Sequence, residues 1–258
     1  MNRIRPGKIK NFTGSFKGDI PQGSGLSSSA ALEIGLAVSL NALFDLQLSD
    51  LELIKAAQQA EHQYVGTQCG IMDQFASMMG KANQAILLDC KTLDFDYIRM
   101  PLNTYKWMII NSNIHHELAS SAYNQRRHEC QEGVEIFRKY EGNINSLREV
   151  TPALLTYHRH SFPPITYNRC QHVVEENLRV MQLVEAMEEG DSNTMGEKIT
   201  ASHMSLRDLY EVSCPEIDFL VENVMRLPGV LGARMIGGGF GGCTLNLLQP
   251  DFDESQLE

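Results

Sequence analysis

The stretch from Gly18 to Glu33 constrains the fold more than any other part of the chain. It reads Gly-Asp-Ile-Pro-Gln-Gly-Ser-Gly-Leu-Ser-Ser-Ser-Ala-Ala-Leu-Glu. A polar, β-prone run from Phe12 to Phe16 precedes it and predicts a strand. The proline and glycines then interrupt regular structure, and a long run of helix-forming residues follows at 30–44. The pattern therefore predicts a strand, a glycine-rich loop and the start of a helix.

Such a loop is suited to binding a phosphate group. The first turn of a helix carries unpaired backbone N–H groups and the positive end of the helix dipole. Gly23 and Gly25 allow the backbone to approach a ligand closely. The serines at 27–29 can bond phosphate oxygens, ligate a magnesium ion or simply cap the helix. No Gly-Lys-Ser/Thr sequence follows, so the loop is not a Walker A motif.

The order of residues from Pro21 to Ala31, Pro-x-Gly-x-Gly-Leu-Ser-Ser-Ser-Ala-Ala, resembles the ATP-binding loop of the GHMP kinases. Within that family, the triple serine is similar to the galactokinase branch. The resemblance implies that ATP and Mg²⁺ are the cofactors and that Ser29 is a magnesium ligand. It also implies ATP contacts from Gly23, Ser24, Gly25, Leu26, Ser27, Ser28 and Ser29.

Two acidic residues, Glu61 and Asp73, lie in the next distinctive segment. Glu61 falls near the end of a predicted helix, where the dipole disfavours a carboxylate. Asp73 stands between apolar residues, which predicts partial burial. Catalytic, metal-binding, capping and surface roles all fit these observations. The segment 60–75 resembles the galactokinase sequence Ala-Glu-His…Cys-Gly-Ile-Met-Asp-Gln-Phe, which implies Glu61 as a magnesium ligand, Asp73 as the catalytic base and Gly70 as a backbone contact to the sugar.

Two further blocks carry the resemblance. The sequence at 115–130 begins like a zincin helix, but Ser120 occupies the position of the second histidine, so a zinc site is excluded. An amphipathic helix with a solvated basic patch at Arg126 and Arg127 is one interpretation. The similarity to His-Glu-Leu-Ala-x-Ser-x-Tyr-Asn-x-Arg-Arg implies that Tyr123 binds the sugar. The glycine cluster at 232–243 resembles the third GHMP motif, with Ile236 where threonine is common.

Composition limits the class of protein. The chain has 258 residues with 43% apolar residues and a net charge of −10, which argues against nucleic acid or an anionic membrane as partner. No apolar run is long enough to span a bilayer. The six cysteines are dispersed, as is typical of reduced thiols in the cytoplasm. We expect a cytoplasmic monomer, and the resemblance implies a small-molecule partner, galactose.

Periodicity and capping signals predict the secondary structure. In the helix at 30–44, Leu32, Leu36, Leu40 and Leu43 form an apolar stripe. Ser49 and Glu52 form a capping box that opens a helix reaching about Val65. We expect irregular structure at 150–167. The remaining elements are helices at 117–140, 168–189, 192–210 and 215–226 and strands at 85–89, 95–100, 107–111, 230–235 and 243–248.

The resemblance implies an α+β, two-domain GHMP kinase-like fold, with a ribosomal S5 domain 2-like unit at 1–103 and a ferredoxin-like unit at 104–258. The implied reaction is transfer of phosphate from Mg·ATP to the 1-hydroxyl of α-D-galactose. A sugar sensor without catalysis and a kinase for galacturonate or N-acetylgalactosamine are the alternatives. The upstream sugar-binding motif of the family and its extreme C-terminus are absent from the sequence, so we expect residues 1–258 alone to be inactive.

Overall fold

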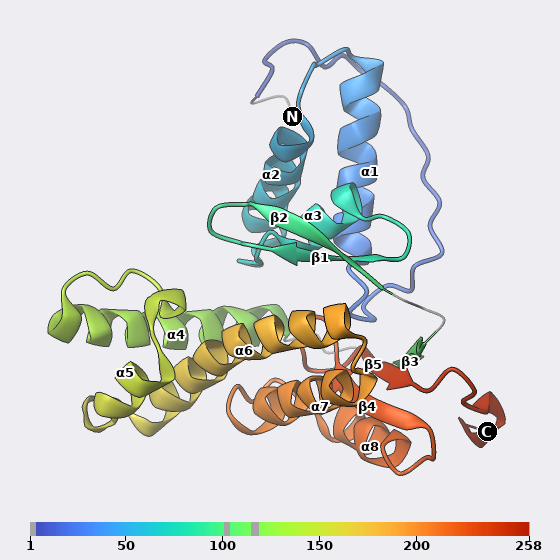
Figure 1. The fold of residues 1–258 in the computed structure, drawn as a ribbon. Coiled ribbons are helices and arrows are strands. Elements are labelled where there is room, and N and C mark those ends of the chain that lie inside the picture. The colour runs from blue at the N-terminus through green and yellow to red at the C-terminus, as the bar shows by residue number, and fades with distance from the viewer. Residues whose placement is uncertain (1–3, 101–103, 115–118, 258) are drawn as a thin grey trace. The chain divides into compact units, whose positions relative to one another are not determined.

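The structure is a computed structural model that describes residues 4–100, 104–114 and 119–257. The chain forms two compact units, residues 1–98 and 99–258 (Figure 1). Helices predominate and the strands form two small sheets, which confirms the α+β class. The boundary expected between residues 103 and 104 lies at the edge of the described residues, and contacts divide the chain between Ile98 and Arg99. The domain limits of 1–103 and 104–258 stay a prediction.

The first unit is a small helical cluster with a β-hairpin (Figure 1). Its helices are α1 (Ser28–Leu43), α2 (Asp50–Ala60) and α3 (Met72–Met79), and its strands are β1 (Gln84–Leu88) and β2 (Phe95–Arg99). The helix α1 packs against both α2 and α3. The contacts between these helices are made by Ile34, Ile54, Ala57, Ile71 and Phe75, all buried. This core holds α1, which carries Ser28 and Ser29, and α3, which carries Asp73.

The strand expected at 12–16 is not formed. Residues 9–19 have no regular structure, and Phe12 and Phe16 are exposed. A strand needs a neighbour that accepts and donates its backbone hydrogen bonds. Among the described residues no strand pairs with this segment. Residue preference alone therefore does not hold it in a sheet.

The apolar stripe expected on α1 is also wrong. Of its four leucines only Leu40 is buried, whereas Leu32, Leu36 and Leu43 are exposed. The buried face is formed instead by Ala30, Ile34, Ala37 and Leu40. Both sets follow helical spacing, because this helix is apolar on more than one side. Spacing alone could not decide which face packs against α2 and α3.

The start of α2 follows its sequence closely. The Ser49 side chain accepts from Glu52 N, and the Glu52 carboxylate accepts from Ser49 N at 2.8 Å, so the predicted capping box is confirmed. The helix ends at Ala60 and continues as a π-helix over Glu61–Val65. The helical segment therefore reaches Val65 as expected, with a wider last turn.

The second unit is built on a three-stranded antiparallel sheet in the order β3-β5-β4. The strands are β3 (Lys106–Asn111), β4 (Val230–Met235) and β5 (Cys243–Leu248). Two helices, α7 (Ser192–Asp208) and α8 (Pro215–Val224), pack on β4, and α4 (Ala119–Glu141) packs on α6 (Pro164–Glu189). Short 3-10 turns lie at Leu147–Glu149, Arg159–Ser161 and Glu254–Leu257. Unlike the strand predicted at 12–16, the strands predicted at 85–89, 95–100, 107–111, 230–235 and 243–248 are all present.

The segment 150–167 is more regular than expected. It contains α5 (Pro152–Tyr157) and the first turn of α6. The Thr151 hydroxyl accepts from Leu154 N at 3.2 Å, and proline occupies the first turn of both helices. Proline fits there because it has no N–H to leave unpaired. The prolines therefore start helices, where we had expected them to disrupt structure.

A network of charged side chains joins α4 and α6 to the segment after α7. Arg169 of α6 is 2% exposed and donates to Glu129, to Glu211 and to the Leu209 carbonyl. Arg126 of α4 donates to the Tyr210 carbonyl at 2.7 Å and pairs with Glu129. The interpretation of Arg126 as part of a solvated basic patch is therefore wrong.

Spanning a bilayer takes an apolar helix of about 20 residues, and the described residues include none.

Candidate active site

The glycine-rich loop leads directly into an uncapped helix. Gly23 and Gly25 have φ angles of 67° and 75°, and Ser27, at the start of α1, has a left-handed conformation. The Ser24 hydroxyl is buried and donates to the Pro21 carbonyl at 2.7 Å, which fixes the loop. The Ser27 side chain makes no capping bond, and the first turn holds no acidic residue. The simple capping role is therefore wrong for Ser27, and the N–H groups of the first turn can meet an anion.

Glu61 lies in the π-helical turn and is 6% exposed. Such turns are rare and often occur at functional sites. In the described part of the chain, no basic side chain forms an ion pair with Glu61. Burying a carboxylate without a cation is costly. Its position therefore fits a residue that meets its cation in a ligand complex.

Asp73 lies in the first turn of α3 and is half-buried, as its neighbours predicted. The next residue, Gln74, is 1% exposed. The Gln74 amide donates to Glu33 of α1 at 3.4 Å, and its carbonyl oxygen has no partner among the described residues. Gln74 thus links α3 to α1 beside the expected base.

The charges that act on the Cys69 thiol identify the acidic groups near it. Burial raises the pKa of the Cys69 thiol, a hydrogen bond from Gln74 lowers it, and the carboxylates of Glu61, Asp73 and Glu33 raise it further. Electrostatic repulsion of this kind falls off with distance. The structure therefore brings Glu61 and Asp73 to one neighbourhood and adds a third carboxylate, Glu33.

Glu33 was not predicted as a site residue. Burial raises its pKa to about 7, the Gln74 hydrogen bond lowers it, and the carboxylate of Glu61 raises it. A signal was present in the sequence, because Glu33 follows Ser29 by four positions. Residues at that spacing lie on the same face of a helix. The expected magnesium ligand Ser29 and Glu33 therefore share one side of α1.

The residues of this unit fit magnesium better than a transition metal. Among the described residues, no group of three His, Cys, Asp or Glu side chains converges to form a metal cage. Magnesium does not need one, because it keeps several waters and binds through one or two carboxylates plus phosphate oxygens. Glu61 and the hydroxyl of Ser29 are of the type that such a site uses.

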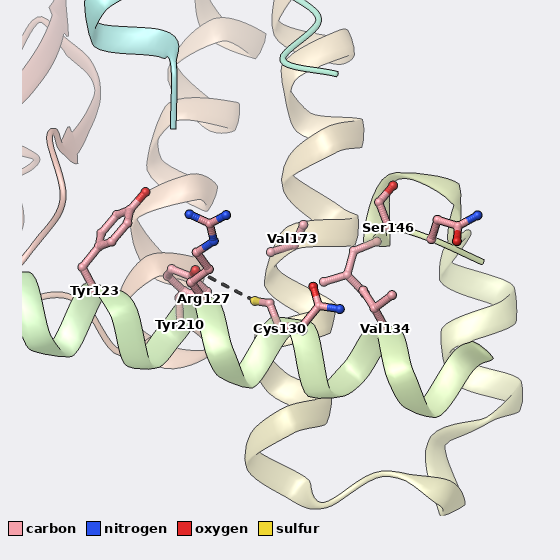
Figure 2. A pocket seen from close by; sticks show the side chains of 10 residues that line it. Tyr123, Arg127, Cys130, Val134, Ser146, Val173 and Tyr210 are labelled. Carbon is pink, nitrogen blue, oxygen red and sulfur yellow. Dashed lines mark hydrogen bonds between the residues drawn. The ribbon is translucent and has the colours of Figure 1, made fainter. Parts of the chain in front are cut away.

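Tyr123 lies in the second unit, on α4. Figure 2 shows Tyr123 and Arg127 on successive turns of α4, at one end of a cavity of about 290 Å³. Cys130 and Tyr210 line the same cavity and are joined by a hydrogen bond of 3.9 Å, drawn as a dashed line. The Tyr123 ring also lies beside the glycine turn, residues 237–242. It is 3.6 Å from the position that a Cβ on Gly238 would take.

The glycine turn at 237–242 joins β4 to β5. A Cβ on Gly239 would lie 2.5 Å from the Val212 carbonyl oxygen, so glycine is required there by close packing. The Ile236 N–H donates to the Cys243 carbonyl at 3.0 Å, a backbone bond that does not depend on the side chain. Isoleucine in place of threonine therefore leaves the base of the turn intact.

Comparison with known proteins identifies the family. The family profile described as the GHMP kinases N terminal domain matches residues 2–81, and that of the GHMP kinases C terminal domain matches residues 183–257. The chain belongs to the GHMP kinase family. The two matched regions fall in separate compact units of the structure, so the expected GHMP kinase-like two-domain fold is confirmed.

Within the GHMP kinases, this chain is similar to galactokinases. It is 47% identical to the galactokinase of Thermotoga neapolitana over 95% of this chain and 66% of that protein. It is 45% identical to the galactokinase of Clostridium beijerinckii over 94% of this chain and 62% of that protein. The crystal structure of Lactococcus lactis galactokinase complexed with galactose matches with a TM-score of 0.87 and 39% identity, covering 91% and 60% of the two chains. The chain thus spans less than two thirds of the length of these relatives.

Proposed function

We propose that this chain carries the ATP-binding, magnesium-binding and base residues of a galactokinase. The reaction transfers the terminal phosphate of Mg·ATP to the 1-hydroxyl of α-D-galactose. The observation that carries the proposal is the grouping of Glu61, Asp73 and Glu33 in the unit that also holds the uncapped start of α1. The similarity to galactokinases over 95% of the chain supports galactose as the sugar.

The roles follow from what phosphoryl transfer requires. Its transition state is loose, so catalysis depends on positioning and on neutralising charge. The N–H groups at the start of α1 would bind phosphate oxygens, and Ser29 and Glu61 would hold the metal. Magnesium, when bound, supplies positive charge to the phosphates. The Asp73 carboxylate accepts the proton of the sugar hydroxyl as its oxygen bonds to phosphorus and ADP leaves.

Tyr123 and Gly70 are proposed to bind the sugar. Tyr123 lines the cavity on α4, and its neighbour in that cavity, Arg127, offers a second polar group (Figure 2). Gly70 lies between Glu61 and Asp73 in the sequence and is exposed. Tyr123 and Gly70 alone do not distinguish galactose from galacturonate or N-acetylgalactosamine, which are the alternative substrates.

The test is a kinase assay on the protein encoded by the full reading frame that contains this sequence. Galactose, galacturonate and N-acetylgalactosamine are each supplied with Mg·ATP, and ADP release is measured. ADP release that depends on galactose supports the proposal, and preference for another sugar refutes the substrate. Galactose binding without ADP release would identify a sugar sensor instead.

Asp73→Asn tests the base in the same assay. The amide keeps the shape of the side chain but does not accept the proton, so we expect turnover to fall by about 10²–10⁴ with galactose binding little changed. Asp96→Asn is the matched control, because Asp96 is an exposed aspartate on β2. Near-normal turnover in Asp73→Asn would exclude the base role.

A further inference from the structure

A single backbone carbonyl in the loop between Glu61 and Asp73 accepts two side-chain hydrogen bonds. The Cys69 carbonyl accepts from the Gln58 amide at 3.2 Å and from the His62 ring Nε2 at 2.8 Å. Gln58 belongs to α2 and His62 to the π-helical turn, next to Glu61. Because a carbonyl only accepts, His62 carries its proton on Nε2 in this contact. Side chains from two helical elements thus fix the position of one peptide group in an irregular loop.

That peptide group also contains the N–H of Gly70. In a trans peptide the C=O and the following N–H are coplanar and point in opposite directions. The described residues contain no cis peptide. Holding the Cys69 carbonyl against Gln58 and His62 therefore aims the Gly70 N–H away from α2.

The Gly70 N–H is available to a ligand. Among the described residues, it donates to no acceptor, and Gly70 is exposed. A Cβ on Gly70 would meet nothing within 4 Å. Neither internal packing nor a positive φ angle therefore accounts for glycine at this position. Close approach by a bound molecule would account for it.

We propose that Gln58 and His62 are positioning residues that aim the Gly70 N–H at a sugar oxygen. The inference rests on the proposed function and adds two residues to it. Neither side chain touches the sugar in this arrangement. Each acts through the Cys69–Gly70 peptide, so its loss weakens sugar binding and spares ATP binding.

The variants remove one donor at a time. Gln58→Met and His62→Phe keep the approximate size of each side chain and lose its N–H. His62→Gln keeps a donor near the position of Nε2. Gln59→Met is the matched control, since Gln59 is an exposed glutamine on the same helix. The KM values for galactose and for ATP are measured in the protein from the full reading frame.

A net hydrogen bond of about 1 kcal/mol corresponds to a change of about fivefold in binding. We expect the galactose KM to rise about 3- to 10-fold in Gln58→Met and in His62→Phe. The ATP KM stays within about twofold in both variants, and His62→Gln and Gln59→Met resemble the wild type. This split between the two substrates is one that a general loss of stability does not produce.

Three results would overturn the inference while leaving the kinase assignment in place. They are an unchanged galactose KM, a parallel rise of both KM values, and loss of folding in both single variants, whose carbonyl still has one donor. A wild-type protein that releases no ADP with any of the three sugars would instead remove the proposed function, and this inference with it.

Discussion

Replacing Arg169 with methionine should cost the second unit much of its stability. The arginine is 2% exposed and donates to two carboxylates and to the Leu209 carbonyl. Methionine fills a similar volume and supplies no donor. The change removes three hydrogen bonds from a buried position and leaves Glu129 with one basic partner in place of two, and removing one member of a buried ion pair is costly.

The size of the effect follows from the exposure of the partners. Removing one member of a buried pair typically costs about 3–5 kcal/mol. The Glu211 side chain is 54% exposed and regains water, so its loss contributes little. Glu129 is 12% exposed but keeps Arg126 at 3.3 Å. We therefore expect the low end of the range, about 3 kcal/mol, against a total of about 5–15 kcal/mol for a typical domain.

The measurement is urea unfolding followed by tryptophan fluorescence. The chain has one tryptophan, Trp107 on β3, so the signal reports the second unit. Arg207→Met is the matched control, because Arg207 is 31% exposed and pairs with the exposed carboxylates of Asp208 and Glu222. Such surface pairs contribute about 0–1 kcal/mol. If Arg169→Met destabilises no more than the control, the network does not support this unit and the reasoning is refuted.

Three further predictions concern the metal, the glycine turn and pH. Glu61→Gln should raise the Mg²⁺ needed for half-maximal activity by at least about tenfold, and an unchanged Mg²⁺ titration excludes Glu61 as a ligand. Gly239→Ala should destabilise by more than about 1 kcal/mol and by more than Gly142→Ala in urea unfolding, because both have positive φ but only Gly239 lacks space for a Cβ. Burial lowers the pKa of His172 to about 4, so the folded state withholds a proton that the unfolded state binds from about pH 6.5 downward. Stability should therefore fall by up to about 3 kcal/mol from pH 6.5 to pH 4, and a His172→Phe variant that loses as much over that range contradicts this.

Most helices and strands were predicted correctly where a single local sequence signal determined them. The Ser49 capping box and the strands around the glycine turn are examples. Prediction failed where the outcome depended on a neighbour. The run at 12–16 has strand-forming residues but no partner strand among those described. The Thr151-Pro152 start of α5 shows that a proline-rich segment can also mark the first turn of a helix.

The face of α1 illustrates a limit of periodicity. Ala30, Ile34 and Ala37 satisfy helical spacing as well as Leu32, Leu36 and Leu43 do. Leu32, Leu36 and Leu43 are nevertheless exposed, and two of the three residues buried in their place are alanines. Small side chains let α1 approach α2 and α3 closely, and that advantage exists only once those helices are in place. The sequence therefore specified a helix but not the side that it buries.

The residues of the candidate site fall into two groups. Some could be predicted from their chemical type, and others are recognised only from contacts between parts of the chain that are distant in sequence. Glu61 and Asp73 were predicted as site residues because carboxylates in a family motif imply metal and proton chemistry. Gln74 and Glu33 are 41 positions apart, and no spacing rule joins them. Gln58 and His62 both donate to one backbone carbonyl. Every residue carries such a group, so residue type does not indicate which carbonyl accepts. Residues that aim a backbone group at a ligand are therefore visible only in the folded chain, even where the motif around them is recognised.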